Sequence, residues 1–354
     1  MMLRILSIAY PLAPVRRNAV GGAEQILAEI DAALVERGHR SLVIACEGSQ
    51  TKGELIALPH IGGPLDASAV DLARARLARR IREVLASRPI DLIHMHGYDF
   101  HHYLPPAGIP LLVTLHLPLS HYPREALLPG RPDSWLNCVS AVQHQAVEDH
   151  PSMLPPIENG VRARETEAQT RRGFALMLTR ICPEKGVHHA IDATKLAGVP
   201  LIICGETFPY PGHLRYFDEE IAPRLDALRR FIGPVGGNRK SWLLGAARCL
   251  LIPSTIAETS SLVAREALAA GTPVIAWRSG ALPDVVDHGR TGFLVDDVEA
   301  MGAAIHRTHE LSPADCYAAA RDRFPLDDMI EGYLSAYRAI LARAGKRHAK
   351  AGAA

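Results

Sequence analysis

The sequence predicts an α/β protein that contains two Rossmann-like domains. Strand-like and helix-like segments alternate along the 354 residues, which is typical of helices layered on a parallel sheet. A strand–helix–strand unit opens the chain, and a second one begins about 160 residues later. A chain of this length can bury two separate cores. Open parallel sheets bind ligands beyond the carboxyl ends of their strands, so we expect the site in a cleft that both sheets face.

The first unit begins at the amino terminus. Leu3–Ala9 is an apolar run that predicts a buried strand, Gly22–Arg37 predicts a helix, and Ser41–Ala45 predicts the next strand. Gly38 ends the helix, because glycine accepts the left-handed conformation that often follows a helix. The apolar residues of this helix recur with helical spacing at Ile26, Leu27, Ile30 and Leu34.

The second unit repeats the design. Phe174–Thr179 predicts a strand, Val187–Leu196 a helix, and Val199–Cys204 a second strand. The loop Arg180–Gly186 joins the first strand to the helix. Between the two units, Pro151–Arg172 combines prolines with a charged stretch, so we place the interdomain linker there.

Composition narrows the class of protein. The chain is 48% hydrophobic and 22% charged, which is typical of a globular protein. A net charge of +1 argues against a general nucleic-acid binder. The apolar run at the amino terminus is too short for a signal peptide, and no run approaches the roughly 20 apolar residues of a membrane span. The six cysteines are scattered without a C-x-x-C pair, which indicates reduced thiols and a cytoplasmic location.

The most informative segment holds two glutamates. Glu258 and Glu266 have seven residues between them, and eight helical steps place them within about a quarter turn of each other. We expect a helix that begins just after Glu258, with Ser260 and Ser261 as capping residues and Gly271 at its end.

The start of this helix suits a phosphate group. The amides of Ser260, Ser261 and Leu262 lie at a positive helix end, where backbone donors lack partners. The two glutamates can accept hydrogen bonds from sugar hydroxyls. Phosphate and hydroxyls together are what a nucleotide sugar presents. A capped core helix with two solvated acids is the alternative.

Arg180 and Lys185 supply positive charge on the predicted loop before a helix. Cations in that position can bind a diphosphate and neutralise its charge as it departs. Ordinary surface charge is the alternative. No Asp-x-Asp motif is present to carry a nucleotide-bound metal. We therefore expect protein cations and a helix dipole in place of Mg²⁺, with no metal site and no cofactor besides the co-substrate.

The glutamate segment resembles the E-x7-E signature of the retaining family-4 (group 1) glycosyltransferases, which have the GT-B fold. Five further segments resemble motifs of that family in the same order, over about residues 1–340. They are the glycine loop Gly21–Glu24, the strand-end histidine of Thr114–His116, the interdomain turn Asn159–Val161, the phosphate-binding segment Arg180–Gly186 and the late turn Gly289–Val295.

The resemblance implies two Rossmann-like domains that face each other across a deep cleft. Residues 1–158 would form the acceptor domain, 159–324 the nucleotide-sugar domain, and 325–345 a helix that crosses back. The implied reaction moves a sugar from a nucleotide diphosphate sugar, most often of UDP, to a hydroxyl acceptor with retention. A glycan, a lipid-linked sugar or a small molecule could be the acceptor. A nucleotide-sugar epimerase on the same fold and a non-catalytic nucleotide-binding protein are the rival functions.

Roles for single residues also follow from the resemblance. Glu258 and His116 would lie at the reacting sugar and form the catalytic pair of residues. Glu266 would bind the ribose. The loop at Gly21 and Gly22 would close over the donor, where the absence of a Cβ allows close approach.

Two sites depart from the family's pattern. The family usually has glycine where Thr179 stands, and Phe-Gly where Ser260 and Ser261 stand. Serine adds a Cβ and a hydroxyl at a position where glycine lets the backbone approach the donor. We therefore expect an effect on which donor sugar binds more than on whether transfer occurs.

Two further features have alternative interpretations. Leu72–Arg88 predicts an amphipathic helix that packs on the sheet, and docking on an anionic membrane surface is its alternative. A group of histidines could bind a metal, but no cysteine and no tight carboxylate spacing joins it, so we expect none. These histidines are His94, His96, His101, His102 and His121.

Overall fold

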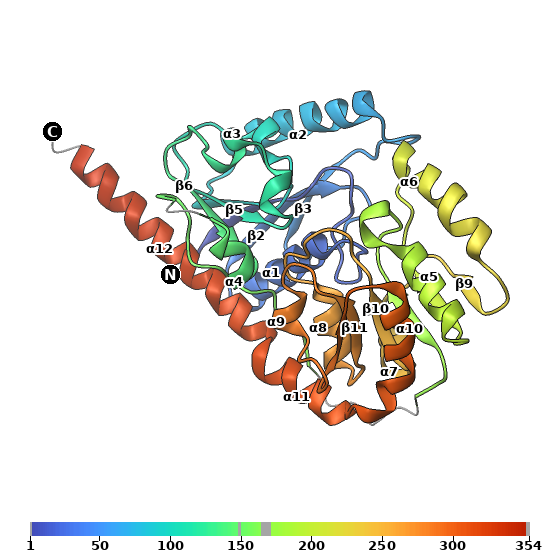
Figure 1. The fold of residues 1–354 in the computed structure, drawn as a ribbon. Helices are drawn as coiled ribbons and strands as arrows, with labels where there is room; N and C mark the ends of the chain where they lie inside the picture. Colours follow the sequence, from blue (N-terminus) through green and yellow to red (C-terminus); the bar gives the residue numbers. More distant parts are fainter. Residues whose placement is uncertain (1, 148–149, 164–170, 352–354) are drawn as a thin grey trace. The chain divides into compact units, whose positions relative to one another are not determined.

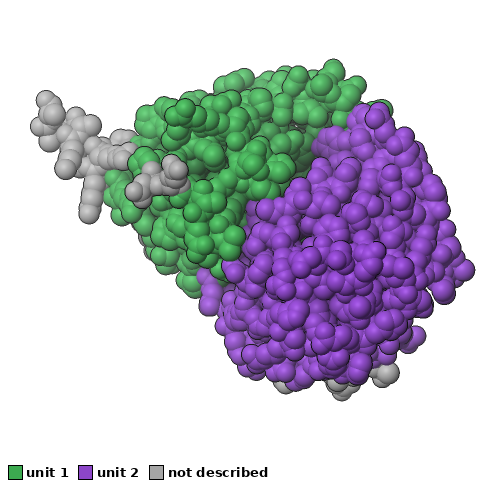
Figure 2. Space-filling model, viewed as in Figure 1, with its two compact units in different colours: residues 1–158, 329–354 green, residues 159–328 purple. Residues whose placement is uncertain are grey.

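The computed structural model describes residues 2–147, 150–163 and 171–351 (Figure 1). The chain divides into two compact units (Figure 2). Unit 1 comprises Met1–Glu158 and Met329–Ala354, and unit 2 comprises Asn159–Asp328. Each unit contains one parallel six-stranded sheet. The predicted α/β class, with one sheet in each half of the chain, is confirmed.

The sheet of unit 1 has the order β3-β2-β1-β4-β5-β6, so the chain builds outward from β1 in both directions. Ile5 of β1 pairs with Ser41 on one side and with Leu92 on the other. The order therefore reverses between β1 and β4, where Rossmann-like sheets bind ligands. The strands are β1 (Arg4–Ile8), β2 (Arg40–Cys46), β3 (Glu54–Leu58), β4 (Leu92–Met95), β5 (Leu111–Leu115) and β6 (Ser134–Cys138).

Helices cover this sheet. They are α1 (Gly22–Glu36), α2 (Ala67–Ser87), α3 (Arg124–Leu127), α4 (Ala141–Gln145) and the 3₁₀ turns Phe100–Tyr103 and Leu119–His121. The last helix, α12 (Leu326–Ala351), begins in unit 2, and its residues from Met329 onward belong to unit 1. Because α12 contributes the buried Tyr333 and Tyr337, the core of unit 1 includes the carboxyl-terminal part of the chain.

The predicted amphipathic helix is α2, and its apolar stripe packs on the sheet of unit 1. Asp66 caps its first turn by accepting a hydrogen bond from the Ala69 amide. Leu77 and Ile81 are buried in the core. Arg74 turns inward and donates to Asp99 at 2.7 Å. Membrane docking of its arginine-rich side stays a prediction, and no described helix is long and apolar enough to cross a bilayer.

Buried polar groups link α12 to the sheet of unit 1. The Thr114 hydroxyl donates its hydrogen to Asn137 Oδ1 at 2.7 Å, so it must accept from His94 Nε2, also at 2.7 Å. The other ring nitrogen of His94 therefore accepts from the Tyr337 hydroxyl at 2.7 Å. Burial lowers the pKa of His94 well below its usual value, in agreement with a neutral ring.

Unit 2 repeats the topology with the order β12-β11-β10-β7-β8-β9. Leu176 of β7 pairs with Leu250 of β10, and the chain builds outward from this pair. The loops after β7 and β10 therefore leave the sheet side by side at its switch point. The strands are β7 (Ala175–Leu178), β8 (Leu201–Cys204), β9 (Arg229–Phe231), β10 (Cys249–Ile252), β11 (Val274–Trp277) and β12 (Gly292–Val295).

Alternate residues of these strands face two separate cores. Leu250 packs in a cluster with α8 and α11, whereas Cys249 and Leu251 pack with α5 and α10 on the opposite face. The helices are α5 (Val187–Leu196), α6 (Pro211–Tyr216), α7 (Gly237–Ala246), α8 (Leu262–Ala269), α9 (Leu282–Val285), α10 (Val298–Arg307) and α11 (Pro313–Arg323). Short turns are Pro183–Lys185, Phe217–Ile221, Ala222–Arg224 and Thr308–Glu310.

Tyr337→Phe should lower the free energy of unfolding by about 1–3 kcal/mol, because His94 would keep a buried acceptor without its donor. Urea denaturation followed by circular dichroism measures the change. Tyr98→Phe, at an exposed tyrosine of the same unit, is the control and should change stability by less than about 0.5 kcal/mol. Equal stabilities of Tyr337→Phe and wild type would contradict the assigned network.

Candidate active site

Two loops of unit 2 approach each other so closely that one contact requires glycine. Gly186 follows the turn after β7 and has a φ of +61°, a left-handed conformation that favours glycine. A Cβ built on Gly186 would lie 2.1 Å from the carbonyl oxygen of Pro253, in the loop after β10. The Thr255 amide also donates to the Glu184 carbonyl at 2.9 Å. The two loops are therefore joined through their backbones.

This approach brings two predicted site residues together. Lys185 Nζ lies 2.6 Å from Glu258 Oε1, and the Ser254 hydroxyl donates to the same oxygen. Burial by itself would raise the pKa of Glu258, but Lys185, Ser254 and the nearby Arg180 charge hold it below its usual value. Glu258 is therefore an ionised carboxylate inside the unit. From the sequence we expect Lys185 to contact the diphosphate and Glu258 the transferred sugar, and in the structure the two side chains form an ion pair.

A second loop fixes the backbone of Glu258. Its carbonyl oxygen accepts from the Ala281 amide at 2.7 Å. Gly280 has a φ of +55°, and a Cβ there would lie 2.2 Å from that same oxygen. The Ser279 hydroxyl donates to the Ile256 carbonyl at 2.6 Å. Sequence reasoning missed this supporting loop. Its one visible feature is the pair Ser279-Gly280, and a single Ser-Gly pair does not indicate which loop it contacts.

The predicted serine cap is wrong. Helix α8 begins at Leu262, with Ser261 at the N-cap position, but the Ser261 side chain makes no capping hydrogen bond. A hydroxyl caps a helix from an extended backbone, and Ser261 is left-handed, with φ 48° and ψ 69°. For a residue that carries a Cβ this conformation costs of order 1 kcal/mol.

The two serine hydroxyls lack partners as a result. Ser260 and Ser261 are only 2% and 7% exposed, and neither hydroxyl has a hydrogen-bond partner within the described part of the chain. Buried hydroxyls in native proteins are normally paired. Both serine hydroxyls lie at the start of α8, whose first amides have no acceptor within the helix. This point of the unit therefore offers several donors to a bound anion.

Glu266 lies further along α8 and also has a cationic partner. Lys240 of α7 donates to Glu266 Oε1 at 2.6 Å. Sequence reasoning missed Lys240, because a single lysine on a helix carries no motif. It also missed Arg265, a fully buried side chain that donates to the carbonyl oxygens of Asn159 and Ser260. Arg265 therefore fixes the backbone of Ser260 just before α8.

Gly21 and Gly22 lie in unit 1, at the start of α1. Gly21 precedes the helix with an extended backbone, and Gly22 is its first residue. A Cβ on Gly21 would lie 1.9 Å from the carboxylate of Glu24. Because that oxygen ends a flexible side chain, a larger residue at position 21 would require only that Glu24 shift. The role of this loop toward a donor stays a prediction.

His116 directly follows β5, as predicted. Its Nε2 lies 3.1 Å from Nδ1 of His96, and the rings of His96 and His94 are 3.9 Å apart. Burial lowers the pKa of His116 to about 3, so the ring is neutral at pH 7. A neutral pair with one hydrogen between the two nitrogens accounts for the short distance.

Comparison with known proteins identifies the family. A sequence model described as "Glycosyl transferases group 1" matches residues 173–310, and one described as "Glycosyltransferase Family 4" matches residues 20–145. The chain belongs to the family-4, group 1 glycosyltransferases. It is therefore an enzyme, and the family inferred from its motifs is confirmed.

Relatives of this glycosyltransferase match over most of its length. Glycogen synthase of Mycobacterium tuberculosis is 26% identical over 91% of this chain and 88% of its own. AviGT4, a glycosyltransferase involved in avilamycin A biosynthesis, has a TM-score of 0.70 at 22% identity and covers 96% of this chain and 98% of its own. Anabaena HepE in complex with UDP-glucose has a TM-score of 0.69 at 21% identity, with 94% and 100% covered. The structural matches confirm the GT-B fold.

The stability that Glu258 contributes should depend on pH. Its pKa is lower in the folded protein, so that contribution is present above the unfolded pKa and is lost as pH falls through the folded one. The difference in unfolding free energy between wild type and Glu258→Gln should therefore shrink below about pH 4. Urea denaturation from neutral to acidic pH measures it, with the exposed Glu299→Gln as control. A difference that stays constant down to pH 3, roughly one unit lower, would contradict the ionised pair.

Proposed function

We propose that this glycosyltransferase moves a sugar from a nucleotide diphosphate sugar, with UDP as the first candidate, to a hydroxyl acceptor with retention of configuration. One observation carries the proposal. The hydroxyls of Ser260 and Ser261, which lack partners among the described residues, lie at the start of α8, in the loop of Glu258, and Lys185 of the neighbouring loop pairs with Glu258. The UDP-glucose complex of the structural relative HepE supports the choice of donor.

The diphosphate binds at the start of α8 and at the loop after β7. Arg180 and Lys185 supply two positive charges, and the helix end and the serine hydroxyls supply further donors. Lys185 turns toward the phosphate when the donor arrives, and it stays close enough to Glu258 to orient that carboxylate. These groups replace a metal ion and neutralise the diphosphate as it leaves, so the reaction uses no cofactor.

The two glutamates hold the two sugars of the donor. Glu258 accepts from hydroxyls of the transferred sugar, and Glu266, about one turn into α8, accepts from the ribose. The departing diphosphate takes the proton of the acceptor hydroxyl, and the new bond forms on the face from which it leaves. His116, in unit 1, is proposed at the reacting sugar as a neutral group. The acceptor is a glycan, a lipid-linked sugar or a small molecule.

A product analysis tests the reaction class. The purified protein is incubated with a panel of nucleotide sugars in EDTA, with and without hydroxyl acceptors, and products are identified by nuclear magnetic resonance. We expect release of the nucleotide diphosphate and a product with the donor's anomeric configuration. A changed nucleotide sugar formed without acceptor would indicate an epimerase. An inverted product, or a requirement for Mg²⁺ or Mn²⁺, would contradict retention or metal independence respectively.

Lys185→Ala should weaken nucleotide binding by about tenfold or more, because a charge-assisted hydrogen bond contributes about 1.5–3 kcal/mol. The variant also removes the cation that pairs with Glu258, so this carboxylate would stand unpaired near the bound phosphates. Calorimetry with UDP and GDP measures the affinity, and the exposed Lys195→Ala, on the helix that follows this loop, is the control. Wild-type affinity of Lys185→Ala for both nucleotides would remove the phosphate assignment.

Glu258→Gln and Glu266→Gln should have different kinetic effects. Contacts to the ribose do not change during transfer, whereas contacts at the reacting sugar can strengthen in the transition state. Glu266→Gln should mainly raise KM for the donor and weaken free UDP binding, and Lys240→Ala should resemble it. Glu258→Gln should mainly lower kcat. If Glu258→Gln instead loses UDP affinity while Glu266→Gln retains it, the orientation of the donor is reversed.

A further inference from the structure

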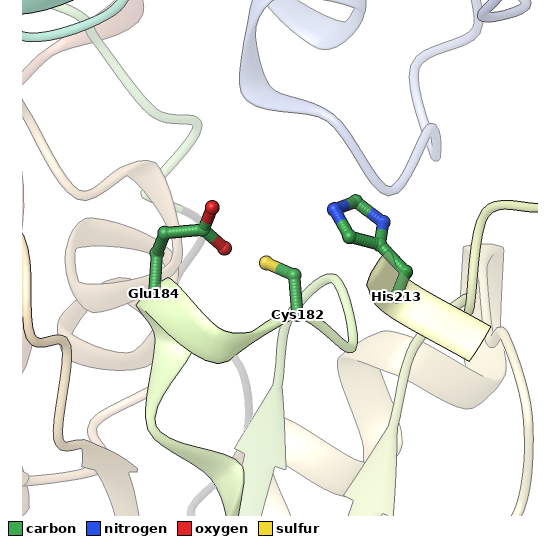
Figure 3. A group of neighbouring side chains, drawn as sticks. All are labelled: Cys182, Glu184 and His213. Atoms are coloured by element: carbon green, nitrogen blue, oxygen red, sulfur yellow. The ribbon is translucent and has the colours of Figure 1, made fainter. Parts of the chain in front are cut away.

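Three potential metal ligands meet in unit 2, next to the predicted phosphate-binding residues. Figure 3 shows the sulfur of Cys182 between the carboxylate of Glu184 and the ring of His213. One ligand atom of each lies within 4.8 Å of the other two. Cys182 and Glu184 come from the turn after β7, and His213 comes from α6. Within the described residues no other such group of histidine, cysteine and acidic side chains exists, so the histidines of unit 1 do not form one.

The three side chains satisfy one another only in part, because the Cys182 thiol shares a hydrogen bond with the Glu184 carboxylate while other polar atoms of the group stay unpaired. Glu184 Oε2 and His213 Nδ1 are buried atoms, and neither has a hydrogen-bond partner among the described residues. The Cys182 thiol lies 3.8 Å from the Arg180 carbonyl oxygen, a long distance even for sulfur. Buried polar atoms are usually paired, so a buried carboxylate oxygen of Glu184 that lacks a partner, in a group of three metal-ligand residues, indicates a missing partner there.

The backbone around these side chains is already fixed. The Glu184 carbonyl accepts from the Thr255 amide at 2.9 Å, and the His213 amide donates to the Tyr210 carbonyl at 2.9 Å. Gly186, with its left-handed φ, ends the turn that carries Glu184. Because the ligand atoms already lie within 4.8 Å of one another, zinc bonds of roughly 2.0–2.3 Å require them to move closer by side-chain rotation.

We propose that Cys182, Glu184 and His213 form a binding site for a thiophilic divalent cation of the zinc type. Sulfur, imidazole nitrogen and carboxylate oxygen are the ligands that zinc takes in proteins, and three of them leave a fourth position for water. A thiolate and a carboxylate together balance the charge of the ion. Bound zinc links the loop of Arg180 and Lys185 to α6. The ion holds this loop in place and takes no chemical part in sugar transfer.

The protonation states of the ligands are compatible with this site. Burial lowers the pKa of His213, so its ring is neutral and can donate a lone pair. Burial raises the pKa of Cys182 to about 11, and an arriving zinc ion must displace the thiol proton, as it does at other cysteine ligands. Arg180 lies close enough to oppose a cation, and the two negative ligands offset its charge.

Metal titration of the full chain tests the site. Chelator-treated protein is titrated with Co²⁺, whose bond to a thiolate gives a near-ultraviolet charge-transfer band, and Zn²⁺ is then added to displace it. We expect one equivalent of Co²⁺ with this band, its loss in Cys182→Ser, and at least about tenfold weaker zinc binding in Glu184→Gln and His213→Ala. Cys204→Ser, which changes another buried cysteine of unit 2 in the same way, should keep the band.

X-ray absorption of zinc-loaded wild type gives a measurement that does not depend on the folding of a variant. One sulfur and lighter nitrogen or oxygen neighbours around zinc are expected. A zinc environment without sulfur, or a cobalt band that survives Cys182→Ser and disappears in Cys204→Ser, would overturn the proposal. The proposal is also overturned if Cys182→Ser, Glu184→Gln and His213→Ala all bind Co²⁺ as wild type does.

Discussion

The contact between two loops at the switch point of the second sheet organises the candidate site. Strands β7 and β10 are neighbours at that point, and the glycine at position 186 lets the loop of one press against the backbone of the other. A larger residue at position 186 would force the two loops apart. That separation would part Lys185 from Glu258, and the buried carboxylate would lose the cation that keeps it ionised.

Strand order alone does not explain why the candidate site lies in unit 2. Both sheets have the strand order of a Rossmann-like fold, and both therefore offer a switch point. Only in unit 2 do the described residues place an acid–lysine pair, a strained serine and the start of a helix on adjoining loops. Backbone strain at Ser261 is offset elsewhere in the fold, for example where the buried Arg265 holds the carbonyl of Ser260.

The first unit depends on a different kind of interaction. Its strands place His94 and His96 one residue apart on the same face, and the last helix of the chain supplies the tyrosine hydroxyl that His94 needs. Neutral imidazoles are the result, because burial disfavours their charged forms. His116 shares this environment, which restricts it to the roles that an uncharged ring can perform.

The sequence alone determined where several helices lie and to which family the protein belongs. Apolar periodicity placed α5 at its observed bounds and α1 within one residue, because these patterns depend only on neighbouring residues. The order of motifs identified the family, since each motif is a local stretch. The site residues named from the sequence occupy two loops and one helix of unit 2, together with a glycine loop and a strand end of unit 1.

Tertiary structure decided how these residues pair. Lys185 contacts Glu258, Glu266 contacts Lys240, and His213 approaches Cys182, and each pair joins segments that are far apart in the chain. No local pattern contains such partners, because they depend on which strands become neighbours and how each loop turns. The conformation of Ser261 is of the same kind. Serine usually caps a helix from an extended backbone, and the surrounding fold imposes a left-handed one, in which its hydroxyl has no partner among the described residues.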